Sequence, residues 1–380
     1  MNKYINGQPA ILLLEDGTQF LGKAIGKRGV TTGEICFNTG MTGYQEIFTD
    51  PSYFGQIMVT ATSHIGNYGI HTNEVESESL KIAGLVCKKF SSHYSRPAAL
   101  LSIQEYFESH NLIGISDVDT RNIVRHIRNK GAMNAIISSE ELDPIKLMEK
   151  LSSVPSMEGL ELSSKVSTAS TYQIDAGEEE YKVALLDLGV KKNIIRCLVD
   201  RGCTVRVFPM NSKFSEIKKW NPNGILLSNG PGDPAALLNV INLAKEIINE
   251  NIPTMGICLG HQVLALAAGM TTSKMHNGHR GVNHPVKNLE TGKCEITSQN
   301  HGFVVNIKDA KSMNNIVITH IHLNDNTLAG FKIKNKNIFS VQFHPESSAG
   351  PNDSRYLFDN FINTMNITAE KNKKASIPKS

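Results

Sequence analysis

The second half of the chain alternates short apolar strands with helical segments, and this alternation restricts the fold more than any other feature. Strand-like runs occur at 183–186, 205–208, 224–227 and 253–257, and helix-like segments at 191–199, 215–220, 237–248 and 262–268. Consecutive β-α-β units predict a parallel sheet with helices on both faces. After residue 280, β-branched residues and glycine become frequent, so antiparallel strands are expected to extend the sheet. The pattern predicts a doubly wound, mostly parallel α/β domain.

The 380 residues are enough for two domains. We expect an N-terminal α/β domain at 1–150, a connector at 151–180 that is rich in Ser and Thr, the second domain at 181–365, and a flexible basic tail at 366–380.

The N-terminal domain carries three local signals. Asp16-Gly17 between apolar runs predicts a β-hairpin with a type I′ turn. Ser102 with Glu105 is a capping-box pattern that predicts a helix start. A further helix is expected from Asp119 to Lys130, because Gly131 provides a stop signal.

The charge and cysteine content exclude several classes of protein. The net charge is +3, and the segment from Glu370 to Ser380 accounts for all of it, with four lysines and one glutamate. A nucleic-acid binder would have a basic body, so we expect no nucleic-acid partner. No apolar run is long enough for a membrane span or a signal peptide. The six cysteines have no zinc-site spacing. We expect a cytoplasmic protein with reduced thiols and no metal site.

Gly256-Ile257-Cys258-Leu259-Gly260 is the sharpest local signal. It follows an apolar strand and precedes a helix, as in the elbow that presents a nucleophile at a strand-to-helix turn. The glycines are needed because a Cβ on either flank would clash with the packed elements. The helix N-terminus favours thiolate, and the Leu259 N–H points at the same space. The alternative is a buried structural cysteine beside a glycine-flanked turn.

A general base is predicted at His344, one of 13 histidines. His344-Pro345-Glu346 follows the β-like run 338–343, and residues two apart in an extended segment share a face. Glu346 would then orient the imidazole, and the set would suit acyl transfer. The alternative is a chance His-x-Glu on the surface.

The turn from Ser228 to Pro234 can expose backbone N–H groups to an oxyanion. Gly230–Ala235 also fits a dinucleotide fingerprint, but it follows the third strand of the domain and contains two prolines. Gly17–Lys23 has P-loop spacing but ends in Ala24 instead of Ser or Thr. The chain therefore offers no convincing nucleotide site, and no cofactor is expected on it.

Cys258-Leu259-Gly260-His261-Gln262, the Gly230–Pro234 turn and His344-Pro345-Glu346, in this order, resemble a class I (triad) glutamine amidotransferase domain of flavodoxin-like fold. Several segments of the first domain, Glu15–Thr18, Phe37–Thr39, Met41–Glu46, Thr49–Tyr53 and Asp119–Arg121, are similar to the small subunits of carbamoyl-phosphate synthetase. Gln299–Phe303 and His284–Val286 fit the same family.

The resemblance implies roles for individual residues. Cys258 would be the nucleophile, His344 the base and acid, and Glu346 its orienting partner. The glutamine contacts would be Ser52, Gly230, Gly232, Leu259, Gln262, Asn300, Gly302 and Phe303. Gly232 and Leu259 would supply N–H groups to the oxyanion.

The resemblance also implies a partner. A large subunit would hold the ATP and Mg²⁺ sites, receive ammonia through an internal tunnel and form carbamoyl phosphate for pyrimidine and arginine synthesis, as a heterodimeric ligase. The alternatives are the glutaminase subunit of another amidotransferase and a free-standing cysteine hydrolase of the same fold. A scaffold that has lost activity is disfavoured by the intact Cys258, His344 and Glu346.

Overall fold

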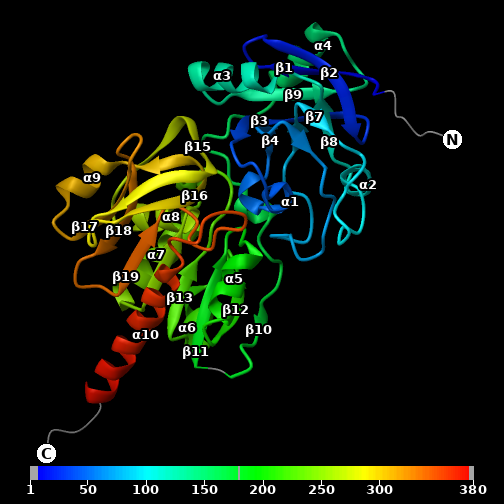
Figure 1. Cartoon of the computed structure of the whole chain (residues 1–380). Coiled ribbons are helices and arrows are strands. Elements are labelled where there is room, and N and C mark those ends of the chain that lie inside the picture. Colours follow the sequence, from blue (N-terminus) through cyan, green and yellow to red (C-terminus); the bar gives the residue numbers. More distant parts are fainter. Residues whose placement is uncertain (1–6, 179, 376–380) are drawn as a thin grey trace, which may run out of the picture. The chain divides into compact units, whose positions relative to one another are not determined.

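The computed structural model describes residues 7–178 and 180–375, and these divide into two units (Figure 1). The first unit contains the residues up to Leu160 together with His276–Gly281. The second contains Glu161–Met275 and the residues from Val282 onward. The division falls inside the segment that the sequence suggests as a connector.

Seven strands of the first unit close into a barrel, in the order β1-β2-β8-β6-β4-β3-β9. Their bounds are β1 Pro9–Leu14, β2 Gln19–Gly26, β3 Val30–Asn38, β4 Gln56–Thr60, β6 Gly84–Val86, β8 Ile113–Ser116 and β9 Asn134–Ser138. Alternate residues of β1 serve two clusters. Leu12 and Leu14 pack in the cluster that includes Ile123, whereas Ile11 and Leu13 on the other face of the strand pack with Leu147. This alternation is the period-two pattern of a strand that is buried on both faces.

The remaining elements of this unit are short. They are α1 Tyr44–Thr49, η1 Pro51–Tyr53, β5 His64–Ile65, β7 Lys89–Phe90, α2 Ile103–Ser109, α3 Thr120–Lys130 and α4 Pro144–Leu151. The predicted capping box is confirmed, because the Ser102 Oγ accepts from the Glu105 N–H and the Glu105 carboxylate accepts from the Ser102 N–H. Asp119 caps α3 and Gly131 ends it, as the sequence predicts.

The predicted hairpin is confirmed, but the prediction of a type I′ turn is wrong. β1 and β2 pair antiparallel with Leu13 opposite Gln19, so the loop is longer than two residues. Only Gly17 among the loop residues has a positive φ, of 86°, whereas a type I′ turn needs two. The Gly17 N–H donates to the Leu14 carbonyl, and the Leu14 N–H donates to the Thr18 carbonyl.

The segment His276–Gly281 belongs to the first unit although it lies far along the chain. The Ala132 N–H donates to the His276 carbonyl at 2.7 Å. Arg280 is buried, and its Nη2 lies 3.8 Å from Oε1 of the buried Glu34. A buried charge needs such a partner, because removal from water is otherwise costly.

The second unit is built on a ten-stranded sheet in the order β10-β12-β11-β13-β14-β19-β18-β17-β15-β16. The bounds are β10 Tyr172–Ile174, β11 Tyr181–Asp187, β12 Cys203–Pro209, β13 Gly224–Leu227, β14 Thr254–Ile257, β15 Thr272–Asn288, β16 Cys294–Val305, β17 Ile316–His322, β18 Leu328–Ile333 and β19 Ile338–Val341. The five strands from β12 to β19 are parallel, in the flavodoxin-like order 2-1-3-4-5. Beyond β19, strands β18, β17 and β15 pair antiparallel, as predicted.

Helices cover both faces of this sheet (Figure 1). They are α5 Lys192–Val199, α6 Phe214–Lys219, α7 Leu238–Glu250, α8 Leu259–Ala267, α9 Ile307–Ser312 and α10 Tyr356–Ala375, with the short turns η2 Ser163–Lys165 and η3 Pro234–Ala236. Ala184 and Leu186 of β11 pack with α6, α7 and α8, whereas Val183 and Leu185 pack with α5 and α10. The doubly wound architecture expected from the sequence is therefore present.

Some boundaries of helices and segments in the structure differ from those predicted from the sequence. α8 begins three residues earlier than expected, at Leu259. The end of the predicted connector forms β10, which pairs antiparallel with β12 at the sheet edge. Residues 366–375, predicted as flexible tail, continue α10, whose apolar face packs on the sheet at Phe358 and Phe361. Residues 376–380 lie outside the described residues. Among the helices of the described ranges, none has the length and apolarity that a membrane span requires.

Candidate active site

Cys258 lies at the junction of β14 and α8 in a strained backbone conformation. Its φ is 53° and its ψ is −102°, outside the regions that a side chain readily adopts. A Cβ on Gly256 would lie 2.8 Å from the Gly260 carbonyl oxygen, and one on Gly260 would lie 2.2 Å from the Leu227 carbonyl oxygen. The two flanking glycines are therefore required by close backbone approach, as the sequence argument predicts.

The sheet brings the predicted base to the cysteine although 86 positions separate them in the chain. β14 and β19 are adjacent and parallel, with Ile257 opposite Val341. The Cys258 N–H donates to the Val341 carbonyl at 2.9 Å. Cys258 and His344 therefore follow the carboxyl ends of neighbouring strands, which is where open α/β sheets place their ligands.

His344 and Glu346 meet as the His-x-Glu pattern predicts. Nδ1 of His344 lies 2.7 Å from Oε1 of Glu346, and both side chains are buried. The His344 N–H donates to the Ser298 carbonyl at 2.9 Å, which fixes the backbone of this segment against β16. With Nδ1 held by the carboxylate, Nε2 is the ring nitrogen left for proton transfer.

Lys191 is a member of this cluster that sequence reasoning missed. Its Nζ lies 3.0 Å from Oε1 of Glu346 and donates to the Ser347 carbonyl at 2.6 Å, and the side chain is buried. Asn193 donates from Nδ2 to the Glu346 carbonyl at 2.6 Å. The signal available in the sequence was a lysine directly after a strand and a Gly-Val turn, at the same sheet edge as Cys258.

The charged groups of this cluster stabilise each other's ionised forms. Burial opposes ionisation of Glu346, but Lys191 and His344 outweigh it and hold the carboxyl pKa at about 2. Burial also opposes charge on His344, yet Glu346 and the Cys258 sulfur raise the imidazole pKa to about 10. The arrangement therefore stabilises an imidazolium beside the cysteine, as acyl transfer through sulfur requires.

The predicted oxyanion elements lie on the same unit as Cys258. Leu259 is the first residue of α8, so its N–H has no acceptor within the helix. A Cβ on Gly230 would lie 2.8 Å from Cδ2 of Leu259, which places the Gly230 turn against the start of α8. Gly232 in this turn has a φ of 92°.

Of the other predicted glutamine contacts of this unit, Asn300 contacts the sulfur and Gln262 contacts Phe303. The Asn300 carbonyl lies 3.5 Å from the Cys258 Sγ, and Nε2 of Gln262 donates to the Phe303 carbonyl at 2.7 Å. Gly302 lies between Asn300 and Phe303 on β16.

Ser52 belongs to the first unit, where it is buried in η1 and its N–H donates to Oδ1 of Asp50 at 2.9 Å. Its role as a glutamine contact stays a prediction.

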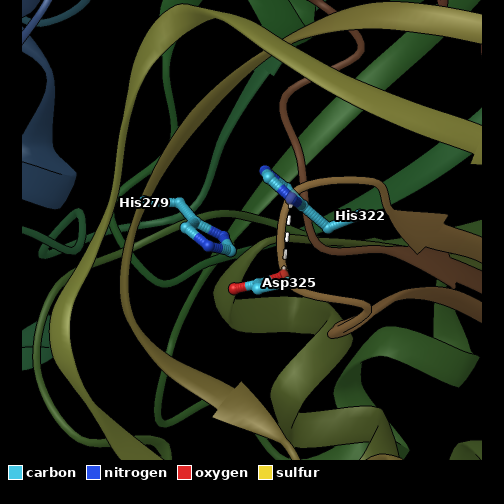
Figure 2. Close-up of side chains that lie close together, drawn as sticks. All are labelled: His279, His322 and Asp325. Carbon is cyan, nitrogen blue, oxygen red and sulfur yellow. Dashed lines mark ion pairs between the residues drawn. The ribbon is translucent and has the colours of Figure 1, made fainter.

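A second histidine cluster lies at the end of β17. Nδ1 of His322 lies 3.4 Å from Oδ1 of Asp325, the ion pair drawn in Figure 2. Nε2 of His322 lies 3.0 Å from Nδ1 of His284. These groups partner one another within the second unit, and we assign them no part in the chemistry below.

Two family models match this chain. The model of the family "Glutamine amidotransferase class-I" matches residues 184–364, and that of "Carbamoyl-phosphate synthase small chain, CPSase domain" matches residues 12–137. The second unit is thus a class-I glutamine amidotransferase domain.

Three similar curated proteins are each called carbamoyl phosphate synthase small chain. The one from Thermotoga maritima is 44% identical, covering 93% of this chain and 97% of its own. The one from Aquifex aeolicus is 46% identical (93% and 98%), and that from Syntrophotalea carbinolica is 44% identical (96% and 99%). The chain belongs to the carbamoyl phosphate synthase small chain family.

Proposed function

We propose that this chain hydrolyses glutamine to glutamate and ammonia through Cys258, His344 and Glu346. The observation that carries the proposal is the strained Cys258 beside a buried imidazole that is held by a carboxylate at 2.7 Å. The family comparisons support glutamine as the substrate, because the matching domain family is defined as glutamine amidotransferases.

The chemistry follows from the geometry. The Cys258 thiolate attacks the side-chain carbonyl carbon of glutamine, and N–H groups of Leu259 and Gly232 stabilise the oxyanion. The His344 imidazolium gives its proton to the departing amine, and a glutamyl thioester remains on the sulfur. His344 then takes a proton from water, which attacks the thioester and releases glutamate. Glu346 holds the tautomer and the cation throughout.

The ammonia would pass to a large chain that binds ATP and Mg²⁺ and converts bicarbonate to carbamoyl phosphate, for pyrimidine and arginine synthesis. The relatives' name supports such a partner, since a small chain implies a large one. A sheltered path would keep ammonia unprotonated, and an uncharged amine is the nucleophile that this reaction needs.

The test is Cys258→Ser in the complex with the large chain. Glutamine-dependent carbamoyl phosphate formation should fall at least about a thousandfold, while formation from free ammonia persists. Unchanged glutamine-dependent activity would refute the assignment of the nucleophile. Full hydrolysis of an amide by the isolated chain, with no product formed with any large chain, would favour the free-standing hydrolase.

A further inference from the structure

Gln342 contacts the nucleophile, and nothing in the motifs points to it. It lies one residue after β19 and two before His344, and its side chain is 1% exposed. Its Nε2 lies 3.8 Å from the Cys258 Sγ, within the range of a hydrogen bond to sulfur. A buried amide aimed at the nucleophile can control which form of the sulfur is stabilised, provided that its orientation is fixed.

The orientation follows from a chain of three groups that starts at a backbone carbonyl. The Phe303 carbonyl can only accept, so the Gln262 atom 2.7 Å from it must be the amide nitrogen. That nitrogen also lies 3.1 Å from the Gln342 side chain, and it can only donate, so Oε1 of Gln342 must face it. The remaining end of the Gln342 amide, which faces sulfur, is therefore the NH₂ group.

An N–H donor favours thiolate, since the donor interacts more strongly with charged sulfur than with a neutral thiol. The Asn300 carbonyl, 3.5 Å from the same sulfur, has the opposite preference because it can only accept from S–H. The Gln342 amide thus supplies the donor that this carbonyl does not.

We propose that Gln342 is a positioning residue that holds the Cys258 thiolate, and that Gln262 and the Phe303 carbonyl set its orientation. The inference rests on the proposed glutaminase function and deepens it. Gln262 and Phe303 are predicted glutamine contacts, so occupation of the substrate site would reach the sulfur through this relay. Because both hydrogens of the Gln262 amide are engaged, only its Oε1 remains for substrate, where it would accept from a donor such as the α-ammonium group.

The experiment is Gln342→Met, a near-isosteric change that removes the donor, in the complex with the large chain. We expect kcat for glutamine hydrolysis to fall about tenfold while KM changes less than twofold. Alkylation of Cys258 by iodoacetamide is followed by mass spectrometry, and the alkylation ratio is the rate at pH 7 divided by the rate at pH 10. This ratio should be lower in Gln342→Met than in the wild type by a similar factor. The exposed Cys294 serves as the internal standard for reagent reactivity.

Two further variants separate this role from a structural one. Asn288→Leu removes another buried amide of the same unit, whose Nδ2 donates to the Tyr356 hydroxyl at 2.8 Å, and should change neither kcat nor the alkylation ratio. Gln342→Glu keeps the shape and the acceptor for Gln262 but, once ionised, cannot donate. It should lower kcat at least as much as Gln342→Met.

Wild-type kcat in Gln342→Glu would overturn the proposal. So would a raised KM with an unchanged alkylation ratio in Gln342→Met, because that result describes a residue that only shapes the pocket. Retained glutamine hydrolysis in Cys258→Ser would instead defeat the proposed function itself, so the two failures are distinguishable.

Discussion

Lys191→Met tests whether the buried lysine holds the Glu346 carboxylate in its charged form. Folding lowers the Glu346 pKa from 4.5 to about 2, which corresponds to roughly 3 kcal/mol of stability at neutral pH. Charge attraction by Lys191 is the largest single cause that lowers this pKa. We therefore expect the variant to lose about 2–3 kcal/mol at pH 7, somewhat less than the roughly 3–5 kcal/mol typical of a broken buried ion pair, because His344 still pairs with Glu346.

The sign of the pH dependence follows from the lowered pKa. The stabilisation is complete above the unfolded value of 4.5 and disappears as the pH falls through the folded value of about 2. The difference between wild type and Lys191→Met should therefore shrink markedly between pH 7 and pH 3.

Urea unfolding followed by tryptophan fluorescence measures this difference in the correct unit, because the single tryptophan, Trp220, belongs to the second unit. Lys332→Met is the matched control. Lys332 pairs with Glu290 on the surface, where both side chains are more than 40% exposed, so its loss should cost less than about 1 kcal/mol. Equal costs for the two variants at pH 7 would refute the reasoning.

Two further predictions concern the turn and the base. Gly260→Ala should destabilise the second unit by several kcal/mol, because its Cβ would lie 2.2 Å from the Leu227 carbonyl oxygen; a Trp220 unfolding curve that matches wild type would contradict this steric argument. Stability carried by the raised His344 pKa is complete below the unfolded value of 6.5 and is lost as the pH rises through about 10. Glu346→Gln removes the first favourable partner of the imidazolium, so the loss of stability between pH 7 and pH 10 should flatten, and an equally steep loss in the variant would show that the carboxylate does not hold the cation.

Local sequence signals predicted the parts of the structure that depend on neighbouring residues. The capping box at Ser102, the stop at Gly131 and the alternation after Tyr181 each depend on contacts within a few positions. The predicted pairing of His344 with Glu346 needed only the period of an extended strand.

Several features that depend on distant residues were not predicted. Lys191 lies 155 positions before Glu346, and only the sheet order shows that their segments meet. The orientation of the Gln342 amide is likewise set by a hydrogen bond from Gln262, which lies 80 positions away in the chain. The closure of seven strands into a barrel in the first unit also needs pairings that hydrophobic patterns do not specify.

The assignment of His276–Gly281 to the first unit has a practical consequence for dissection of this chain. A fragment cut after Leu160 would lack Arg280 beside the buried Glu34 and the His276 carbonyl that receives the Ala132 N–H. Such a fragment would keep the buried Glu34 carboxylate without the Arg280 cation, and the complementary piece would carry residues 276–281 without their contacts in the first unit. Neither half of this polypeptide is therefore an independent building block for domain shuffling, even though two family boundaries suggest a simple cut between them.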